Sequence, residues 1–118
     1  MDTLVVGKFK EDRYNHGAIA KEIYDFFRGD MNRIARQVFS RDSQGRTCFV
    51  LGEAAQSFCI RGAWHRLVDM EPDTWGGPTA GEDAFAQFLG YESAYFLADL
   101  NNNDPEAMMN VLAQKIAN

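Results

Sequence analysis

Apolar residues recur at helical spacing over most of the chain. Within residues 16–28 they fall on one helical face, at Ile19, Ile23, Phe26 and Phe27. Asn15 can cap this segment at its start, and Gly29 can end it. The pattern therefore predicts a helix over 16–28.

The strongest helical pattern covers residues 53–69. Its main apolar face contains Ala55, Phe58, Cys59, Gly62, Ala63 and Leu67, and the face is widened by Ile60, Trp64 and Val68. The polar strip is narrow and consists of Arg61, His65 and Asp69 at four-residue spacing. A face this wide predicts a central helix that is contacted on more than one side. A helical glycine costs about 0.5–1 kcal/mol relative to alanine, so we expect Gly62 to let another helix approach closely.

Three further helices are predicted after an irregular segment, 70–81, that is rich in proline and glycine. They cover residues 82–89, residues 91–100 and a final segment that begins after Asp104. Asp104 can cap this last helix, and Pro105 suits its first position. Its buried stripe is predicted at Met108, Val111, Leu112 and Ile116.

Two regions carry a β signal. Residues 3–9 form a short apolar run that fits a strand, although Gly7 weakens it. Residues 30–39 follow a helical period from Asp30 onward. A turn at 41–46 followed by the apolar run 47–51 instead favours a hairpin over 36–51. The pattern leaves both alternatives open for residues 30–51.

Composition indicates one compact domain over residues 1–118. The length suits a single domain, and 46% hydrophobic with 25% charged residues is ordinary for a globular protein. No apolar run approaches the roughly 18–20 residues that span a bilayer. We predict a mainly α fold, a compact bundle of four or five helices with at most a small β-hairpin or a short N-terminal strand.

Cysteine usage points to a reducing compartment. Cys48 and Cys59 are too few for a disulfide scaffold. Residues 1–12 contain no basic segment followed by a long apolar one, so we expect no secretory signal. The expected location is the cytoplasm, with both thiols reduced.

The net charge of −5 is distributed unevenly. Residues 1–66 carry eleven basic and eight acidic residues, for a charge of +3, whereas 67–118 carry only Lys115 against nine acids, for −8. The two halves could face each other within the fold, or one could present a single-signed surface to a partner. An acidic surface of this size would repel nucleic acid and attract a basic protein surface.

The acidic half also contains a tryptophan in a polar loop, next to Gly-Gly-Pro. Trp75 is either packed back as a plug, which the cost of exposing an indole favours, or exposed as a contact anchor. The candidate partner-binding residues are Asp69, Glu71, Asp73, Trp75, Glu82, Asp83 and Glu92.

An arginine cluster offers an alternative binding patch. It consists of Arg28, Arg33, Arg36, Arg41 and Arg46, opposed only by Asp30 and Asp42. Guanidinium groups bind phosphate and carboxylate in a fixed fork geometry, so the patch could hold nucleic acid or another anion. The competing interpretation, which the low pI of about 4.9 favours, is that these arginines pair with the protein's own acidic half.

Enzymatic chemistry has little support in the sequence. Cys59 and His65 lie about 120° apart around a helix axis, so they do not form a dyad by themselves. Neither the close Cys and His pairs of zinc sites nor a phosphate-binding glycine loop occurs, so we expect no metal and no cofactor. A small cysteine-dependent enzyme using Cys59 or Cys48 is the last alternative.

The middle of the chain resembles a family of small actinobacterial and phage domains of uncharacterised function. The resemblance rests on an Asp-x-x-Gly-Arg segment and a following helix with a cysteine and Gly-Ala, here Asp42, Gly45, Arg46, Cys59, Gly62 and Ala63. The family tends to carry Trp-Asn-Asp before its last helix, whereas Leu97, Ala98 and Asp99 stand here. The resemblance implies a small domain from a phage or mobile element.

These observations together predict a small, acidic, non-enzymatic binding protein. We expect it to act as an inhibitor or adaptor that occupies a basic surface of a host protein, with Trp75 as the anchor. The alternatives are a nucleic-acid-binding accessory protein that uses the arginine cluster and the cysteine-dependent enzyme.

Overall fold

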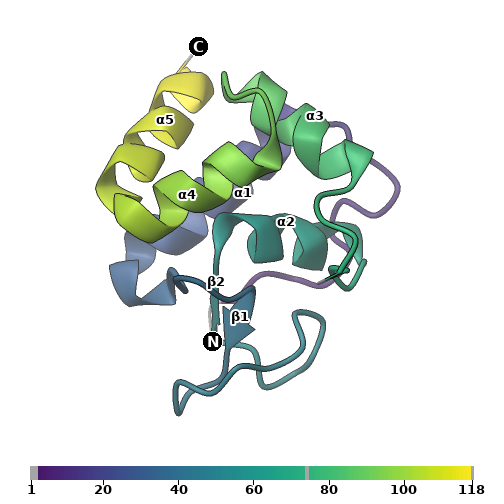
Figure 1. The fold of residues 1–118 in the computed structure, drawn as a ribbon, viewed down its shortest axis with the longest axis vertical. Helices are drawn as coiled ribbons and strands as arrows, with labels where there is room; N and C mark the ends of the chain where they lie inside the picture. Colours follow the sequence, from purple (N-terminus) through teal and green to yellow (C-terminus); the bar gives the residue numbers. More distant parts are fainter. Residues whose placement is uncertain (1–2, 74, 118) are drawn as a thin grey trace.

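The computed structural model describes residues 3–73 and 75–117, and this part of the chain is mainly helical. It contains five α-helices, one short 3₁₀-helix and one two-stranded antiparallel sheet (Figure 1). In chain order the elements are α1 (His16–Gly29), η1 (Met31–Arg33), β1 (Ser40–Arg41), β2 (Ser57–Phe58), α2 (Ile60–Val68), α3 (Ala80–Phe88), α4 (Ala94–Asn103) and α5 (Pro105–Ala117). The predicted fold class is confirmed.

Helix α2 lies at the centre of the packing. It contacts α1 and α4, while α5 packs along α1 and also against α4. Every residue of α2 except Arg61 is buried, which agrees with a helix contacted on more than one side. The core around it includes Phe27, Phe58, Trp64 and Phe85. No helix in the described part is long and apolar enough to cross a membrane.

The predicted boundaries hold best where a side chain caps the helix. Asn15 accepts a hydrogen bond from the backbone N–H of Ala18 at the start of α1, and Asp104 accepts one from that of Ala107 in α5. At α3, the hydroxyl of Thr79 accepts from the N–H of Glu82. The Glu82 carboxylate accepts from the N–H of Thr79 in return, which completes a capping box.

The central helix is shorter than its apolar pattern predicts. Residues 53–59 are not helical: a turn leads into β2, and Cys59 caps α2, its Sγ accepting from the N–H of Gly62. Backbone pairing explains the difference, because the carbonyl of Phe58 accepts from the N–H of Ala35 at 2.9 Å. The same apolar residues are thus buried by an extended segment instead of a helix.

One further prediction is wrong, and the structure bears on one alternative that the sequence left open. Residues 3–9 form no strand: 3–5 are irregular and turns begin at residue 6, where Gly7 takes a φ of 75° and its N–H donates to the carbonyl of Arg66. Within residues 30–51 the only helical residues are those of the short η1, so most of this segment differs from the helical alternative. The hairpin alternative is closer, since the N–H of Cys48 donates to the carbonyl of Ser40. Arg41 of β1 also forms an isolated antiparallel bridge with Thr47, whereas the regular partner of β1 is β2, which lies outside 36–51.

Asn101 joins three elements through its buried amide. Its Oδ1 accepts from the N–H of Ile60 at 2.9 Å, and its Nδ2 donates to the carbonyl of Ala35 at 2.8 Å. The side chain therefore satisfies the first N–H of α2 and a carbonyl of the segment before β1 from a position on α4. Nothing in the sequence distinguishes this asparagine from its neighbours Asn102 and Asn103.

Replacing Asn101 with alanine is expected to lower the free energy of unfolding by about 3 kcal/mol, because two buried backbone groups lose their partner. Urea unfolding followed by circular dichroism measures this. Asn103→Ala, at the exposed end of the same helix, is the matched control and should change the value by less than about 0.5 kcal/mol. Equal effects of the two variants would contradict the role of Asn101.

Candidate functional site

The segment between α2 and α3 presents an almost fully exposed tryptophan. The side chain of Trp75 is 97% exposed, so the expectation that it packs back as a plug is wrong. Its surroundings are ordered by local contacts. The N–H of Trp75 donates to Asp73 Oδ1 at 2.9 Å, and backbone N–H groups of Trp75 and Gly76 lower the pKa of Asp73.

Gly77 fixes the other side of this loop. Its φ of 74° lies in the left-handed region, and a side chain there would collide with the hydroxyl of Tyr95. The loop therefore lies against the first turn of α4. Trp75 thus lies between a local turn at Asp73 and a glycine whose backbone lies close to Tyr95.

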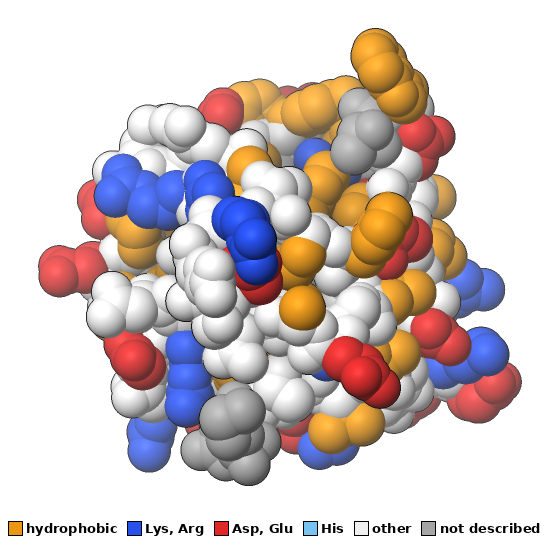
Figure 2. Space-filling model, turned by 90° about the horizontal axis from the view of Figure 1, so that it is seen from below, with side chains coloured by type: hydrophobic (Ala, Val, Ile, Leu, Met, Phe, Trp, Pro, Cys, Tyr) orange, Lys and Arg blue, Asp and Glu red, His pale blue; other side chains and the backbone are white. Residues whose placement is uncertain are grey.

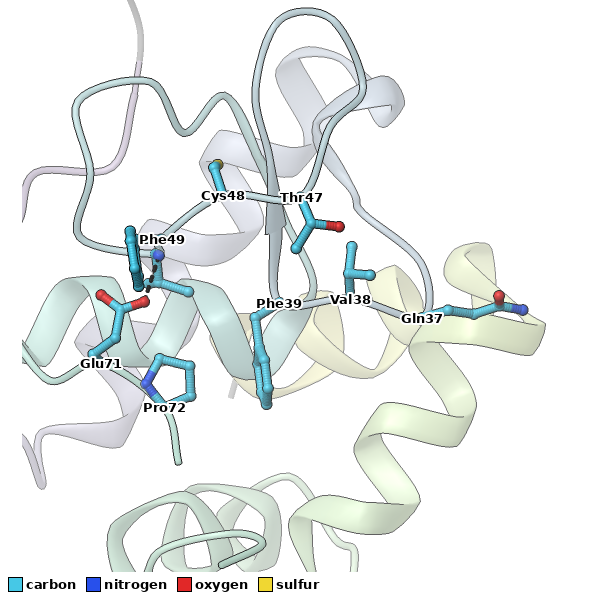
Figure 3. A pocket seen from close by; sticks show the side chains of 9 residues that line it. Gln37, Val38, Phe39, Thr47, Cys48, Phe49, Glu71 and Pro72 are labelled. Carbon is cyan, nitrogen blue, oxygen red and sulfur yellow. Dashed lines mark hydrogen bonds between the residues drawn. The ribbon is translucent and has the colours of Figure 1, made fainter. Parts of the chain in front are cut away.

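Next to this loop lies an open hollow of about 590 Å³. Its lining comes from two extended segments and from the residues after α2, and consists of Gln37, Val38, Phe39, Thr47, Cys48, Phe49, Val50, Glu71 and Pro72 (Figure 3). Phe49 is 76% exposed, which is unusual for a ring of this size. The volume lies in the range of ligand pockets, and apolar groups form most of the wall.

Two contacts to α2 hold the walls of the hollow in place. At Gly62 a Cβ atom would collide with the carbonyl of Phe39, so the glycine lets this extended segment lie directly on the helix. The expected close approach at Gly62 is thus made by an extended segment and not by another helix. On the other wall, the buried guanidinium of Arg66 donates to the carbonyls of Val50 and Gly52 at 2.6 and 3.0 Å.

Glu71 lies at the rim of the hollow and holds the same wall through two hydrogen bonds. Its two carboxylate oxygens accept from the N–H groups of Val50 at 2.7 Å and Leu51 at 3.1 Å. Figure 3 shows Phe49 and Glu71 next to each other on one side of the hollow. Among the described residues no Lys or Arg side chain forms an ion pair with Glu71 or with Asp73. Both acids are exposed, so these charges face solvent.

The remaining predicted acidic residues have other surroundings. Asp69 ends α2 in a left-handed conformation and lies 3.4 Å from the Nζ of Lys10. Asp83 is half-buried and accepts from the N–H of Ala94, at the start of α4. Glu92 is exposed in the turn just before α4. The exposed acids closest in sequence to Trp75 are therefore Glu71 and Asp73.

Glu82 does not belong to any exposed face, because it is only 2% exposed. Its Oε1 lies 2.7 Å from Arg61 Nε and 3.1 Å from His65 Nε2, and the other ring nitrogen of His65 contacts the carbonyl of Met70. Burial acts to raise the pKa of Glu82, but hydrogen bonds from His65 and Arg61 outweigh it and lower the pKa to about 2. Two members of the predicted polar strip, Arg61 and His65, thus pair inside the protein with a carboxylate of the acidic half.

Figure 2 views the molecule from the side of residues 42–56. Hydrophobic side chains gather over the upper and right parts of this face with acidic ones among them. Lys and Arg side chains form a row at the upper left and also lie at the right and lower edges.

The arginine cluster is held largely by backbone carbonyls. Arg33 donates to the carbonyl of Phe26, Arg36 to that of Asn102 and Arg41 to that of Gly45. Arg46 pairs with Asp42 at 3.1 Å, and Arg28 lies over the ring of Tyr24. Arg36 thus reaches α4 in the acidic half, but through a backbone carbonyl. The expected pairing with acidic side chains of that half is not seen for Arg28, Arg36, Arg41 and Arg46 among the described residues.

The environment of Cys59 gives no support to a thiol nucleophile. The side chain is buried, and burial raises the pKa of its thiol to about 11, so it is protonated at neutral pH. Cys48 is half-buried and lines the hollow. In residues 3–73 and 75–117 no group of three or more His, Cys, Asp and Glu side chains is placed to hold a metal ion.

The sequence reasoning missed most of the hollow. Phe39 and Phe49 were not candidate site residues, because their apolar runs were interpreted as core elements, and Pro72 was interpreted only as part of the irregular segment 70–81. The one available signal was the Gly-Arg turn at 45–46, which favours a hairpin and thereby brings residues 37–39 near 47–49. No feature of the sequence predicted that Arg66 would donate hydrogen bonds to three backbone carbonyls.

Comparison with models of protein families, with curated proteins and with solved structures finds no match to this chain. The resemblance to small phage and actinobacterial domains therefore stays a prediction. The function has to be argued from the loop, the hollow and the charges around them.

The carboxylate of Glu82 gives a test of the buried cluster by pH. Because its pKa in the folded protein is lowered to about 2, its contribution to stability is complete above the ordinary value of 4.5 and is lost as the pH falls toward 2. At pH 7 Glu82→Gln should therefore destabilise the protein by about 3 kcal/mol. The difference from the unmodified protein should shrink between pH 4.5 and pH 2. Urea unfolding at several pH values measures it, and a pH-independent difference would contradict the assignment.

The buried thiol makes a second prediction. In a Cys48→Ser variant, Cys59 should react with an aromatic disulfide reagent at a rate set by opening of the fold, and rapidly once the protein is unfolded in urea. The absorbance of the released thiolate measures both rates. In the reciprocal Cys59→Ser variant the half-buried Cys48 should react faster. A Cys59 that reacts in the folded protein as fast as a free thiol would reopen the cysteine-enzyme alternative.

Proposed function

We propose that this protein is a non-enzymatic binding domain that docks the surface around Trp75 and Phe49 onto a basic surface of another protein. The observation that supports this most strongly is the exposure of Trp75. Exposing an indole is unfavourable in water, and tryptophan is among the residues that contribute most to protein interfaces. Its exposure is explained when a partner covers it.

The order of the loop supports the same function. Asp73 closes a local turn by accepting from the N–H of Trp75, and the backbone at Gly77 lies close to the hydroxyl of Tyr95. These two features reduce the conformational freedom that the loop loses when the indole is buried at an interface. A flexible loop would lose part of the binding free energy to this ordering. Phe49, which lies next to Glu71, adds a second exposed aromatic ring from a separate segment.

The charge around the aromatic residues supports a basic partner. Glu71 and Asp73 flank the aromatic residues without an ion-pair partner among the described residues, and Glu92 lies in the turn before Tyr95. The chain as a whole carries −5. Such a surface attracts a positively charged protein over a distance, and salt weakens that attraction. Inhibition or adaptation of a host protein, and an origin in a phage or mobile element, are the biological settings proposed for it.

The function is tested by capture on the immobilised full chain, from a nuclease-treated lysate of the source organism at low and high salt. The expected result is one near-stoichiometric basic protein whose retention falls as salt rises. Trp75→Ala should reduce the retained amount at least about tenfold, as for an interface hot spot. Asp73→Asn, which keeps the acceptor for the N–H of Trp75 and removes the charge, should reduce the salt dependence.

The matched control is Tyr14→Ala, which removes an exposed aromatic ring from a different part of the chain. It should leave capture unchanged, and both tyrosine and tryptophan variants should keep the urea midpoint of the unmodified protein. Retention of the partner by Trp75→Ala would refute the proposed surface. Partners that appear only without nuclease, and that are lost in Arg36→Ala with Arg41→Ala, would support the nucleic-acid alternative.

A further inference from the structure

We propose that the hollow between Phe39 and Phe49 is a pocket for an arginine side chain of the partner, with Glu71 as the group that binds its guanidinium. This inference rests on the proposed function and names the chemistry that the basic partner brings to one place on the surface. Trp75 does not line the hollow, so the proposed function alone gives the hollow no role. The arginine pocket assigns it one.

The carboxylate of Glu71 is fixed before any ligand arrives. Its two oxygens are held by the N–H groups of Val50 and Leu51, yet each oxygen keeps a further lone pair. The side chain therefore needs no reordering when a cation binds. The buried guanidinium of Arg66 interacts electrostatically with Glu71, but it donates its hydrogen bonds to backbone carbonyls. An exposed carboxylate therefore stands fixed at the rim of an apolar hollow.

The walls beside this carboxylate suit the other parts of an arginine. Phe49 lies next to Glu71 and is 76% exposed, so its ring offers a face on which a planar guanidinium can stack (Figure 3). Val38, Phe39 and Pro72 provide an apolar surface for the aliphatic stem. A fixed carboxylate, an exposed ring and an apolar wall together match a side chain that is flat and cationic at its end and aliphatic along its length.

Val38 indicates that the arginine belongs to a peptide segment. Among the described residues its backbone N–H and C=O make no hydrogen bond, although the residues on either side are held: the N–H of Gln37 donates to Asn102 and the carbonyl of Phe39 accepts from Cys59. An extended segment of the partner can supply the missing donor and acceptor. A second copy of this chain is the less suitable occupant, because it would bring the same acidic rim against Glu71.

The experiment uses the ¹⁵N-labelled full chain and three capped pentapeptides, Gly-Leu-X-Leu-Gly, in which X is arginine, lysine or the neutral isostere citrulline. The amide signals of Val50 and Leu51 are the reporters, because these two groups donate to Glu71. The arginine peptide should shift both signals in a saturable titration. The citrulline peptide should bind about fivefold or more weakly, and the lysine peptide should fall between them.

Glu71→Gln keeps an oxygen acceptor and removes the charge, and it should weaken the arginine peptide to the level of citrulline. Glu106→Gln, an exposed glutamate in α5, is the control and should leave the titration unchanged. Equal binding of the arginine and citrulline peptides, or shifts confined to amides away from the hollow, would overturn the arginine pocket. So would an equal affinity for the lysine peptide.

The two proposals fail in different ways. If Glu71→Gln captures the partner as well as the unmodified chain does while Trp75→Ala does not, the arginine pocket is wrong and the binding surface stands. If Trp75→Ala still captures the partner while Glu71 binds the arginine peptide as expected, the peptide pocket stands and the surface around Trp75 is wrong.

Discussion

The buried guanidinium of Arg66 is the interaction on which the irregular half of this protein depends. From the last turn of α2 it donates to the carbonyls of Leu4, Val50 and Gly52, while its own carbonyl accepts from Gly7. The N-terminal turns and the loop after β1 make their backbone hydrogen bonds mostly within themselves. One side chain with several donors in a fixed fork ties both of them to α2. Asn101 does the same on the other side of α2, between Ile60 and Ala35. The helices form the core, and these two polar side chains decide where the remaining chain lies on it.

This division explains what the sequence could predict. Helices α1 and α5 follow from apolar periodicity and from caps at Asn15 and Asp104, because those signals are local. The start of α2 does not, because residues 53–59 are equally apolar in a helix or in an extended segment. The choice is made by pairing with Ala35 and Phe39, which lie far away in sequence. The apolar period shows which residues are buried. It does not show which segment of the chain covers them.

The candidate site could likewise be predicted from the sequence only in part. Exposed acids and a tryptophan beside Gly-Gly-Pro can be recognised in the sequence, and the loop indeed displays Trp75. The burial of Glu82 could not be foreseen, since its two roles depend on Thr79 in its own capping box and on Arg61 and His65 in another helix. The hollow could not be foreseen either, because its walls are separate segments joined through Gly62 and Arg66. The charge distribution along the sequence suggested that the acidic half binds a partner. The packing of the fold determines which of its acidic side chains remain exposed and can contact one.

The left-handed backbone at the start of the hollow has a consequence for association between copies of the protein. Gln37 has a φ of 69°, so the extended segment 38–41 cannot continue as a strand on its N-terminal side. Without this break, the unpaired backbone of Val38 would belong to a longer open edge beside exposed aromatic rings, an arrangement that templates edge-to-edge pairing. The N–H of Gln37, held by Asn102, keeps the residue in that conformation. A conformational strain of about 1 kcal/mol at one residue thus limits the edge to a length that suits a short peptide and discourages aggregation.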